Sequence, residues 1–538
     1  MIFMKKRLNK KKVFGVLIIL IVSCSVFYYN LQKDKITNED NTKIFLIGLD
    51  GATWDVMMPL VEQGKLPNMQ RLMNNGVYGN LTTISMTPIL SSVAWTSLAT
   101  GKIPEKHGIR SWDVTRLSIK SKTVWDILEE NGKKIGLLNY LITWPPRKIN
   151  GFMVPGWARL DSTTYPPELY EELKKESQEE EIREYYIKKY ENSSYLFKNF
   201  ACWDFWRTDY RANQTLYLMD KYETDFFATT FYGPDSLQMF FWQFIEPELF
   251  NVSQEELKKH KEVIPSYYQK FDGIIGKITS KLDENTIVII ASDHGFKVLN
   301  PSHRQIRLYA LSFLEKMDLL KRGESIDMEG FDLSQSKAYA LVKSAPDEMQ
   351  ILINKEIVKG EYDTIKNYII ETLENITITG TDIKILKLSY EDDQKFEIGF
   401  NLINKNNLSY DTNITFLNED CPLIWFTRIE EKTGQHAVNG ILIMSGKKLN
   451  KNKLIKNASI IDVAPTILYL MNIPIPIDMD GKVLVDAINP GYIKDYPIIK
   501  TNIKTDLNID KEETARLEEQ AKTNEEYREK LRSLGYIN

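Results

Sequence analysis

Acidic residues and histidines stand at the ends of several short apolar runs. Asp50 closes KIFLIGLD, Asp235 closes TDFFATTFYGPD, and Asp293 and His294 close NTIVIIASDH. His436 stands just before another run, GILIMSG. One such acid is more often a helix cap than a ligand, but carboxylate oxygens and imidazole nitrogens are common donors to divalent cations. Three acids and two histidines in this pattern therefore predict a metal site.

Two hydroxyl groups stand at the start of an expected helix. Ser91 and Ser92 precede Val93–Thr100, and Gly101 ends the helix. One of the serines is expected to be the N-cap residue. A hydroxyl there also faces free amide N–H groups and the positive end of the helix dipole, which attract phosphate or sulfate. A metal on that hydroxyl would lower its pKa and supply a nucleophile without a histidine base.

The apolar runs indicate the scaffold that brings these residues together. Runs that are apolar almost throughout are typical of parallel strands covered by helices on both faces. Ligand sites in such sheets lie at the carboxyl ends of the strands. We therefore expect an α/β domain in which the acids and histidines meet at one edge of a mostly parallel sheet.

Composition narrows the function classes. Of 538 residues, 43% are hydrophobic and 26% are charged, as in globular proteins. The 69 Lys and Arg nearly balance the 73 Asp and Glu, so no nucleic acid polymer is expected as a partner. Three cysteines exclude a cysteine-rich zinc module and a disulfide scaffold. A histidine-based metal site must use some of the five histidines: His107, His260, His294, His303 and His436.

The N-terminus predicts a membrane anchor. Residues 5–12 read KKRLNKKK and residues 13–29 read VFGVLIILIVSCSVFYY, a basic stretch before an uncharged apolar one. This pattern is typical of a signal anchor or a signal peptide, and the basic end stays in the cytoplasm. We expect a single transmembrane helix, with the rest of the chain on the extracytoplasmic side of the cell membrane. A lipoprotein acylated at Cys24 stays open, because Ile21-Val22-Ser23-Cys24 resembles a lipobox.

Longer motifs run in order from about residue 43 to the C-terminus. They include IGLDGATWD, SVAWTSLATGKIPEKHGI, NYLITWPPRKINGFMVPGW, SDHGF, GQHAVNGILIMSG and IIDVAPTILYLMNIPIPIDMDGKVL. Together they resemble the type I phosphodiesterase/nucleotide pyrophosphatase branch of the alkaline phosphatase superfamily and its bacterial membrane-anchored relatives. The resemblance implies an alkaline-phosphatase-like three-layer α/β/α domain with peripheral inserts. It also implies two divalent metal ions, with zinc or manganese compatible with the donors.

The resemblance implies a role for each residue of the first metal site. One ion would be held by Asp50, Asp293, His294 and the oxygen of the nucleophile. Counting back from Thr100-Gly101 places that nucleophile at Ser91. The implied reaction is in-line attack of Ser91 on phosphorus, followed by hydrolysis of a phosphoseryl intermediate.

The second metal site is expected to be incomplete. The resemblance implies Asp235, His436 and a histidine four residues after Asp235, but PDSLQMFFW places Met239 there. A thioether is a weak ligand for zinc. His303 is a possible substitute ligand.

Four other residues are candidates for supporting roles around the site. His107 is expected to support the helix that carries the nucleophile. Asn139, Lys102 and Asp113 could line the substrate pocket, although each is more often structural.

The expected function is hydrolysis of phosphate esters, most of all phosphodiesters and nucleotide pyrophosphates. A phosphoethanolamine- or glycerol-phosphate-type transferase of the same superfamily remains an alternative, as does a binding or scaffold protein weakened by Met239. A sulfatase would need x-Pro-x-Arg after its Cys or Ser, and neither Ser91 nor Cys421 has it. A cofactor-independent phosphoglycerate mutase would carry no anchor.

These features divide the sequence into consecutive parts. We expect a basic cytoplasmic segment at 1–12, the anchor or signal segment at 13–29, a linker at 30–42, the catalytic domain at 43–485 with inserts at about 160–215 and 329–430, and a tail with a charged helix at 486–538.

Overall fold

The computed structural model describes most of the chain from residue 41 to residue 507. The described residues are 41–84, 88–111, 115–156, 163–191, 193, 197–250, 252–300, 305–321, 332, 334–341, 348–408, 412–430 and 432–507. The basic segment, the expected helix at 13–29 with Cys24, His303, Asp113 and the charged terminal helix all lie outside them. Within the described ranges, no helix combines the length and the apolar character needed to cross a lipid bilayer.

The chain forms two compact units, which are described separately. The first contains the described residues up to Ser236, Val263–Phe296 and those from His436 onward. The second contains Leu237–Glu262 and Lys297–Gln435.

An eight-stranded sheet forms the centre of the first unit. Its strands are β1 (Lys43–Leu49), β2 (Gly76–Thr82), β3 (Ile135–Tyr140), β4 (Gly151–Pro155), β5 (Phe226–Phe231), β6 (Thr286–Ala291), β18 (Asn439–Ser445) and β19 (Lys453–Ser459). Their order is β19-β2-β18-β6-β1-β5-β3-β4. β18 pairs antiparallel with β2 and β6, and the other neighbours pair in parallel. The mostly parallel central sheet predicted from the apolar runs is therefore confirmed.

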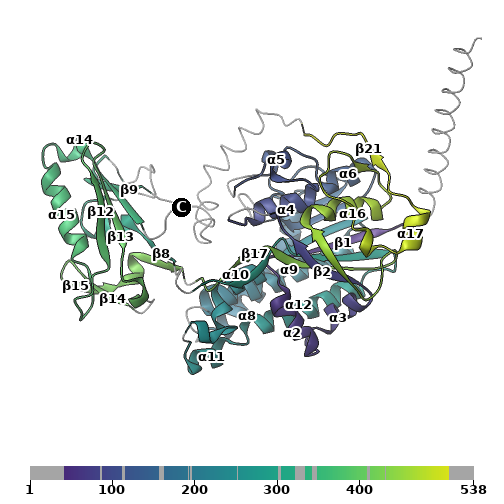
Figure 1. Ribbon diagram of the computed structural model, residues 1–538, viewed down its shortest axis with the longest axis horizontal. Coiled ribbons are helices and arrows are strands. Elements are labelled where there is room, and N and C mark those ends of the chain that lie inside the picture. Colours follow the sequence, from purple (N-terminus) through teal and green to yellow (C-terminus); the bar gives the residue numbers. More distant parts are fainter. Residues whose placement is uncertain are drawn as a thin grey trace, which may run out of the picture. The chain divides into compact units, whose positions relative to one another are not determined.

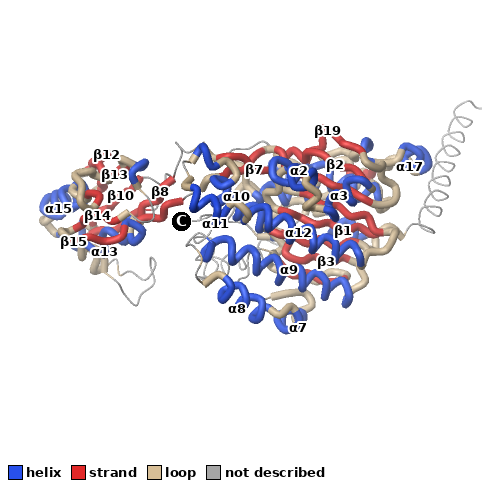
Figure 2. The backbone as a smooth tube through the Cα atoms, turned by 90° about the horizontal axis from the view of Figure 1, so that it is seen from below, coloured by secondary structure: helices blue, strands red, loops and turns tan. Residues whose placement is uncertain are grey.

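Helices cover both faces of this sheet, which gives three layers (Figures 1 and 2). One layer contains α4 (Ser91–Thr100), α5 (Pro104–His107), α6 (Val124–Glu130) and α16 (Val463–Leu470). The other contains α2 (Trp54–Glu62), α3 (Pro67–Asn74), α9 (Cys202–Lys221) and α12 (Val263–Ser280), with α7 (Leu169–Glu176) and α8 (Glu179–Lys189) packed on α9. The unit is completed by α17 (Pro490–Asp495), β20 (Ile475–Pro476) and β21 (Lys500–Thr501).

β1 illustrates why the central strands are apolar on both faces. Six of its seven residues are buried between the helix layers, so alternate side chains enter opposite halves of the core. At Gly48 a Cβ atom would lie 2.7 Å from the Trp95 ring of α4. The glycine thus lets α4 pack closely against the strand, near the end of β1 that Asp50 follows.

The second unit is built on antiparallel sheets. A four-stranded sheet has the order β12-β13-β10-β9, a three-stranded sheet has the order β11-β14-β15, and β16 pairs with β8. The strands are β8 (Gln305–Leu308), β9 (Ala338–Leu341), β10 (Glu348–Ile353), β11 (Thr377–Ile378), β12 (Leu386–Asp392), β13 (Glu397–Leu402), β14 (Asn413–Phe416), β15 (Glu419–Pro422) and β16 (Thr427–Glu430). Its helices are α11 (Gln254–His260), α13 (Ala310–Lys316), α14 (Lys355–Val358) and α15 (Tyr362–Glu374). α15 packs on the four-stranded sheet and closes a separate apolar core.

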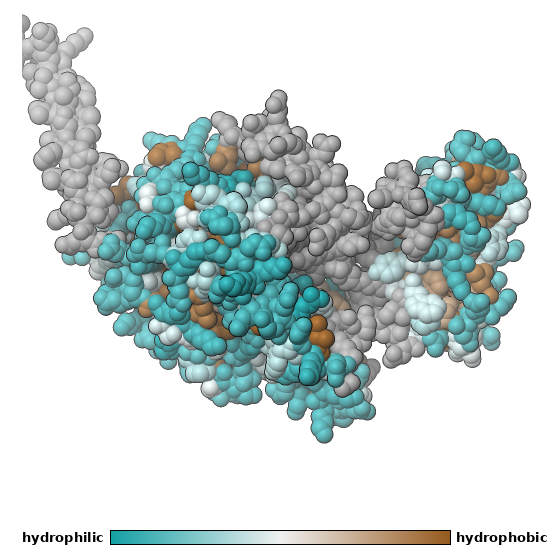
Figure 3. Space-filling view, turned by 180° about the vertical axis from the view of Figure 1, so that it is seen from behind, coloured by the Kyte–Doolittle hydropathy of each residue, from teal (hydrophilic) through white to brown (hydrophobic). Residues whose placement is uncertain are grey.

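The surface is mainly polar. Figure 3 shows one face, on which hydrophilic side chains dominate and hydrophobic ones form small separate patches. This agrees with a chain in which 26% of the residues are charged.

Candidate active site

The candidate metal ligands meet at one edge of the central sheet. Asp50 directly follows β1, and Asp293 and His294 follow β6. Asp235 lies in the first turn of α10 (Gly233–Phe241), which follows β5, and His436 precedes β18. Because β18, β6, β1 and β5 are neighbours and only β18 is reversed, all five residues lie at the same edge.

His294 lies at the centre of this group. Its Nε2 is 3.5 Å from Asp293 Oδ2, 3.6 Å from Asp50 Oδ1 and 3.9 Å from Asp235 Oδ1. His436 Nε2 is 2.9 Å from Asp235 Oδ1. Two donor groups result, Asp50–Asp293–His294 and Asp235–His294–His436, and in each the donor atoms lie within 4.8 Å of one another. His294 belongs to both groups.

The structure separates the roles of the two serines at the start of α4. Ser91 Oγ is 3.1 Å from His294 Nε2, whereas Ser92 Oγ donates a hydrogen bond to the Ser111 carbonyl at 2.9 Å. The expectation that one serine is the N-cap residue is wrong, because Leu90 occupies that position and provides no side-chain cap. Ser91 therefore places its hydroxyl at the positive end of a ten-residue helix, facing the acids.

Each of two buried acids uses one oxygen for the protein and directs the other to the centre. Asp50 Oδ2 accepts a hydrogen bond from Trp95 Nε1 at 2.8 Å, and Asp293 Oδ1 accepts one from the Gly51 N–H at 3.3 Å. Asp50 Oδ1 and Asp293 Oδ2 are buried and accept no hydrogen bond from any residue that the structure describes. Oxygen atoms of this kind beside an imidazole fit a divalent cation.

The pKa values of Asp50 and Asp293 indicate that this pocket favours a cation. Burial, together with Asp293 and Asp235, raises the pKa of Asp50 well above its usual range. Burial and then Asp235 raise the pKa of Asp293 to about 7. Carboxyl groups that repel one another in a buried pocket gain most from a bound positive charge.

The pKa values of the two histidines shift in opposite directions. Burial, and then His436, lower the pKa of His294 to about 3, so it is neutral. Its Nδ1 is 3.0 Å from the Gly295 carbonyl and carries the proton, which leaves the Nε2 lone pair facing Ser91 and the acids. For His436, burial opposes the charged form, but the Asp235 carboxylate outweighs it and raises the pKa. His436 Nδ1 lies 3.0 Å from the Ile89 carbonyl.

Met239 lies on α10 four residues after Asp235. It is half-buried, and its carbonyl oxygen accepts a hydrogen bond from the Thr433 N–H at 2.7 Å. The side chain at this position is therefore not confined to a sealed apolar core.

The side chain and the backbone carbonyl of Asn139, one of the expected pocket residues, both make hydrogen bonds within the chain. Asn139 is the next-to-last residue of β3 and has a left-handed backbone with a φ of 59°, and its Nδ2 donates a hydrogen bond to the Thr230 carbonyl at 2.7 Å. Its own carbonyl accepts a hydrogen bond from the Tyr232 hydroxyl at 2.6 Å.

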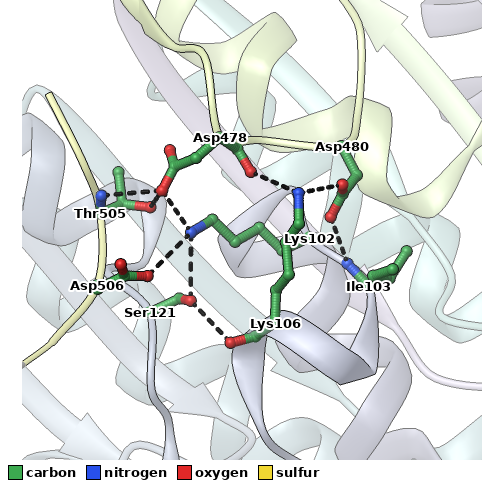
Figure 4. Close-up of polar contacts among 8 residues, drawn as sticks. All are labelled: Lys102, Ile103, Lys106, Ser121, Asp478, Asp480, Thr505 and Asp506. Atoms are coloured by element: carbon green, nitrogen blue, oxygen red, sulfur yellow. Dashed lines mark hydrogen bonds and ion pairs between the residues drawn. The ribbon is translucent and has the colours of Figure 1, made fainter. Parts of the chain in front are cut away.

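Of the two expected pocket residues that the structure describes, Lys102 is the more deeply buried. It is 1% exposed, and its Nζ lies 2.8 Å from Asp478 Oδ2 and 3.4 Å from Ser121 Oγ. Figure 4 shows that Asp478 also receives hydrogen bonds from Thr505, so Lys102 joins the end of α4 to the C-terminal segment. His107, also buried, has Nε2 2.9 Å from Ser97 Oγ and so contacts α4.

Sequence reasoning did not identify three contacts that shape the site. The Trp95 indole and the Gly51 N–H orient the carboxylates, and Asp478 neutralises Lys102. Trp95 and Gly51 lie inside the motifs SVAWTSLATG and LDGATWD, but a residue type alone does not show which carboxylate it contacts.

Comparison with known proteins adds a family match. The family model for type I phosphodiesterase / nucleotide pyrophosphatase matches residues 44–399, more than half of the chain. A comparison with curated proteins found no match. Human ectonucleotide pyrophosphatase/phosphodiesterase 5 is 14% identical, with 84% of this chain and 99% of that chain covered and a TM-score of 0.39. A variant of alkaline phosphatase PafA is 16% identical, with coverages of 84% and 100% and a TM-score of 0.43.

Proposed function

The chain belongs to the type I phosphodiesterase / nucleotide pyrophosphatase family and is a phosphoric ester hydrolase, and we propose that it cleaves phosphodiesters with Ser91 as its nucleophile. One observation carries the proposal. Ser91 Oγ lies at the start of α4, 3.1 Å from His294 Nε2, beside both donor groups. The alkaline-phosphatase-like α/β fold supplies this arrangement at the edge of its mostly parallel sheet.

Ser91 Oγ gives up its proton to solvent and attacks phosphorus in line, the bond between phosphorus and the ester oxygen breaks, and that oxygen takes a proton from water and leaves as the alcohol. Water then hydrolyses the phosphoseryl group and restores the serine. The first turn of α4 offers N–H groups and the positive end of its dipole to the equatorial phosphate oxygens. Asp50 and Asp293 cannot act as phosphate ligands themselves, because like charges repel, so their place is to hold cations.

We propose that two divalent ions bind here, with zinc or manganese as candidates. Asp50, Asp293, His294 and the Ser91 oxygen would hold the first ion. Asp235 and His436 would hold the second, less tightly, because Met239 offers only a thioether. When bound, such ions supply positive charge that lowers the pKa of the serine hydroxyl and stabilises the phosphate oxygens.

We also propose that the reaction takes place on the extracytoplasmic side of the cell membrane. The basic stretch at 5–12 and the apolar stretch at 13–29 support this orientation. A protease added to intact cells should then digest the folded units, and protection of both units would refute the orientation.

The test of the function is turnover of bis(p-nitrophenyl) phosphate by the full chain. We expect Ser91→Ala to lose hydrolysis by about three orders of magnitude or more, while Ser92→Ala keeps most of it because its hydroxyl bonds to Ser111. The reverse result would assign the nucleophile to Ser92. Product formation that requires an added alcohol acceptor would indicate a transferase.

A non-catalytic binding role is the second candidate, and Met239 is the observation that favours it. A chain that binds metal but does not turn over any diester, monoester or nucleotide would support this role.

A further inference from the structure

A groove of about 580 Å³ lies over one end of the central sheet, where β19, β2 and β18 are neighbours, next to the N-terminus of α2. Its volume falls within the range of about 300–1,000 Å³ that is typical of small-molecule sites. Aromatic rings of Trp54 and Tyr78 form part of the lining, and the amide side chains Asn80, Asn439 and Asn457 form another part. None of these residues belongs to the donor groups around His294.

An irregularity of β19 builds one wall of this groove. A Cβ atom at Gly79 of β2 would lie 2.2 Å from the Ile455 carbonyl, so the glycine lets the two strands approach closely. The pairing register then shifts between Ile455 and Ala458, which leaves Lys456 and Asn457 outside the regular ladder. Asn457 has a φ of 58°, and both side chains are exposed along the groove.

The lining combines apolar faces with uncharged hydrogen-bonding groups. Trp54 Nε1 donates to the Gly79 carbonyl at 3.0 Å, which fixes the indole against the strand. Amide side chains both donate and accept hydrogen bonds. Thr82 Oγ1 is 3.1 Å from Asn439 Oδ1. Lys456 is the charged residue of the lining, and no acid contributes to it among the residues that the structure describes.

This chemistry selects a ligand with apolar faces and many hydroxyl groups. Aromatic rings present apolar faces to a ligand, amides match hydroxyls, and a lone lysine tolerates neutral or anionic ligands. A sugar has all these properties. A flat nucleobase suits the groove less well, because the Trp54 and Tyr78 rings are 6.0 Å apart and inclined by 62° and cannot stack on both of its faces.

The groove begins beside the catalytic edge. Trp54 lies four residues after Asp50, and Asn439 lies three residues after His436. The carbonyl of Asn439 packs so closely on Gly295, the residue after His294, that a Cβ atom there would lie 2.0 Å from it.

We propose that this groove binds sugar units of a glycan. Resting on the proposed function, we further propose that the phosphodiester cleaved at Ser91 is carried by such a glycan, with the sugar held in the groove and the ester at the sheet edge.

Calorimetric titration of the full chain carrying Ser91→Ala tests the groove without turnover. The probes are maltotetraose, chitotetraose and tetragalacturonate. We expect at least one of them to bind, and Asn457→Gly and Lys456→Met each to weaken that binding by about 2- to 10-fold, the value of one hydrogen bond.

Two neighbouring residues provide matched controls. Asn452 is exposed with a φ of 47° and Lys451 is exposed, and neither lines the groove, so Asn452→Gly and Lys451→Met should change the affinity less than 2-fold.

Two outcomes would overturn the groove proposal. These are failure of all three probes to bind at millimolar concentration, or equal effects of the groove variants and the control variants. The proposed function fails separately, if hydrolysis does not depend on Ser91. Sugar binding without Ser91-dependent hydrolysis would keep the groove and refute the glycan ester as substrate, whereas hydrolysis without sugar binding would overturn the groove alone.

Discussion

The imidazole rings of His294 and His436 stack with their centroids 3.8 Å apart and their planes inclined by 21°. Two rings this close repel each other if both are charged. Burial and His436 accordingly lower the pKa of His294, while Asp235 holds that of His436 above its usual value. Burial, and then the neighbouring His436, therefore keep His294 neutral at the point that both donor groups share.

This shared position leads to the first prediction. His294→Ala should lower the metal content of the purified chain more than His436→Ala, because His294 belongs to both donor groups and His436 to one. Zinc per chain, measured after dialysis against a fixed free zinc concentration, checks this. His260→Ala, whose histidine lies in the second unit, is the control. Equal losses for the two site variants would show that His294 does not serve both groups.

The second prediction concerns Met239. Replacement by histidine should raise zinc binding toward two ions per chain, because catalytic zinc is normally held by three protein ligands and Asp235 and His436 provide two. Residues four apart share one face of a helix, and both positions lie on α10. Since Met239 is half-buried, an imidazole at this position would not be enclosed in the core without a hydrogen-bond partner. Zinc stoichiometry and diester turnover should rise together, with Met239→Ala as the control. Two ions already bound by the wild type would contradict the idea of an incomplete site.

The third prediction concerns the ion pair of Lys102 and Asp478 (Figure 4). Asp478→Ala leaves the ammonium buried without its nearest carboxylate and should lower the free energy of unfolding by about 3 kcal/mol. Lys102→Met removes the charge while keeping the length of the side chain and should cost less. Urea denaturation measures both. Lys106→Met is the matched control, because Lys106 is 44% exposed and exposed pairs contribute about 1 kcal/mol or less. An Asp478→Ala effect no larger than that of the control would mean that Lys102 is solvated.

The residues at the sheet edge were accessible to sequence reasoning, because an apolar run that ends in an acid defines both a buried strand and its carboxyl end. Lys102 was not. It was expected near the substrate, but its partner Asp478 lies 376 residues away and no local pattern connects them. The side chain of Asn139 depends on a left-handed backbone that places its amide on Thr230. The wall of the groove depends on a register shift in β19. A one-residue shift in strand pairing does not change how many hydrophobic residues the strand contains, so the sequence did not reveal it.

The last prediction concerns His107, which is fully buried and contacts Ser97 of α4. Its Nδ1 accepts a hydrogen bond from the Ile109 N–H at 3.2 Å, so Nε2 carries the proton and donates to Ser97 Oγ. Burial, and then Arg110, lower its pKa from 6.5 to about 4. As the pH falls, the unfolded chain therefore binds a proton at His107 at a higher pH than the folded chain does. The stability from the neutral histidine is complete above pH 6.5 and declines toward pH 4.

A His107→Gln variant isolates this contribution, because glutamine keeps an N–H donor for Ser97 but does not titrate. We expect the variant to be less stable than the wild type at pH 7.5. The difference in the free energy of unfolding should then shrink by about 1.4 kcal/mol for each pH unit between 6.5 and 4, since only the wild type loses stability at this position. Acids around His294 titrate equally in both proteins and cancel in the difference. Urea denaturation at four pH values measures it, and a difference that stays constant with pH would show that folding does not lower the pKa of His107.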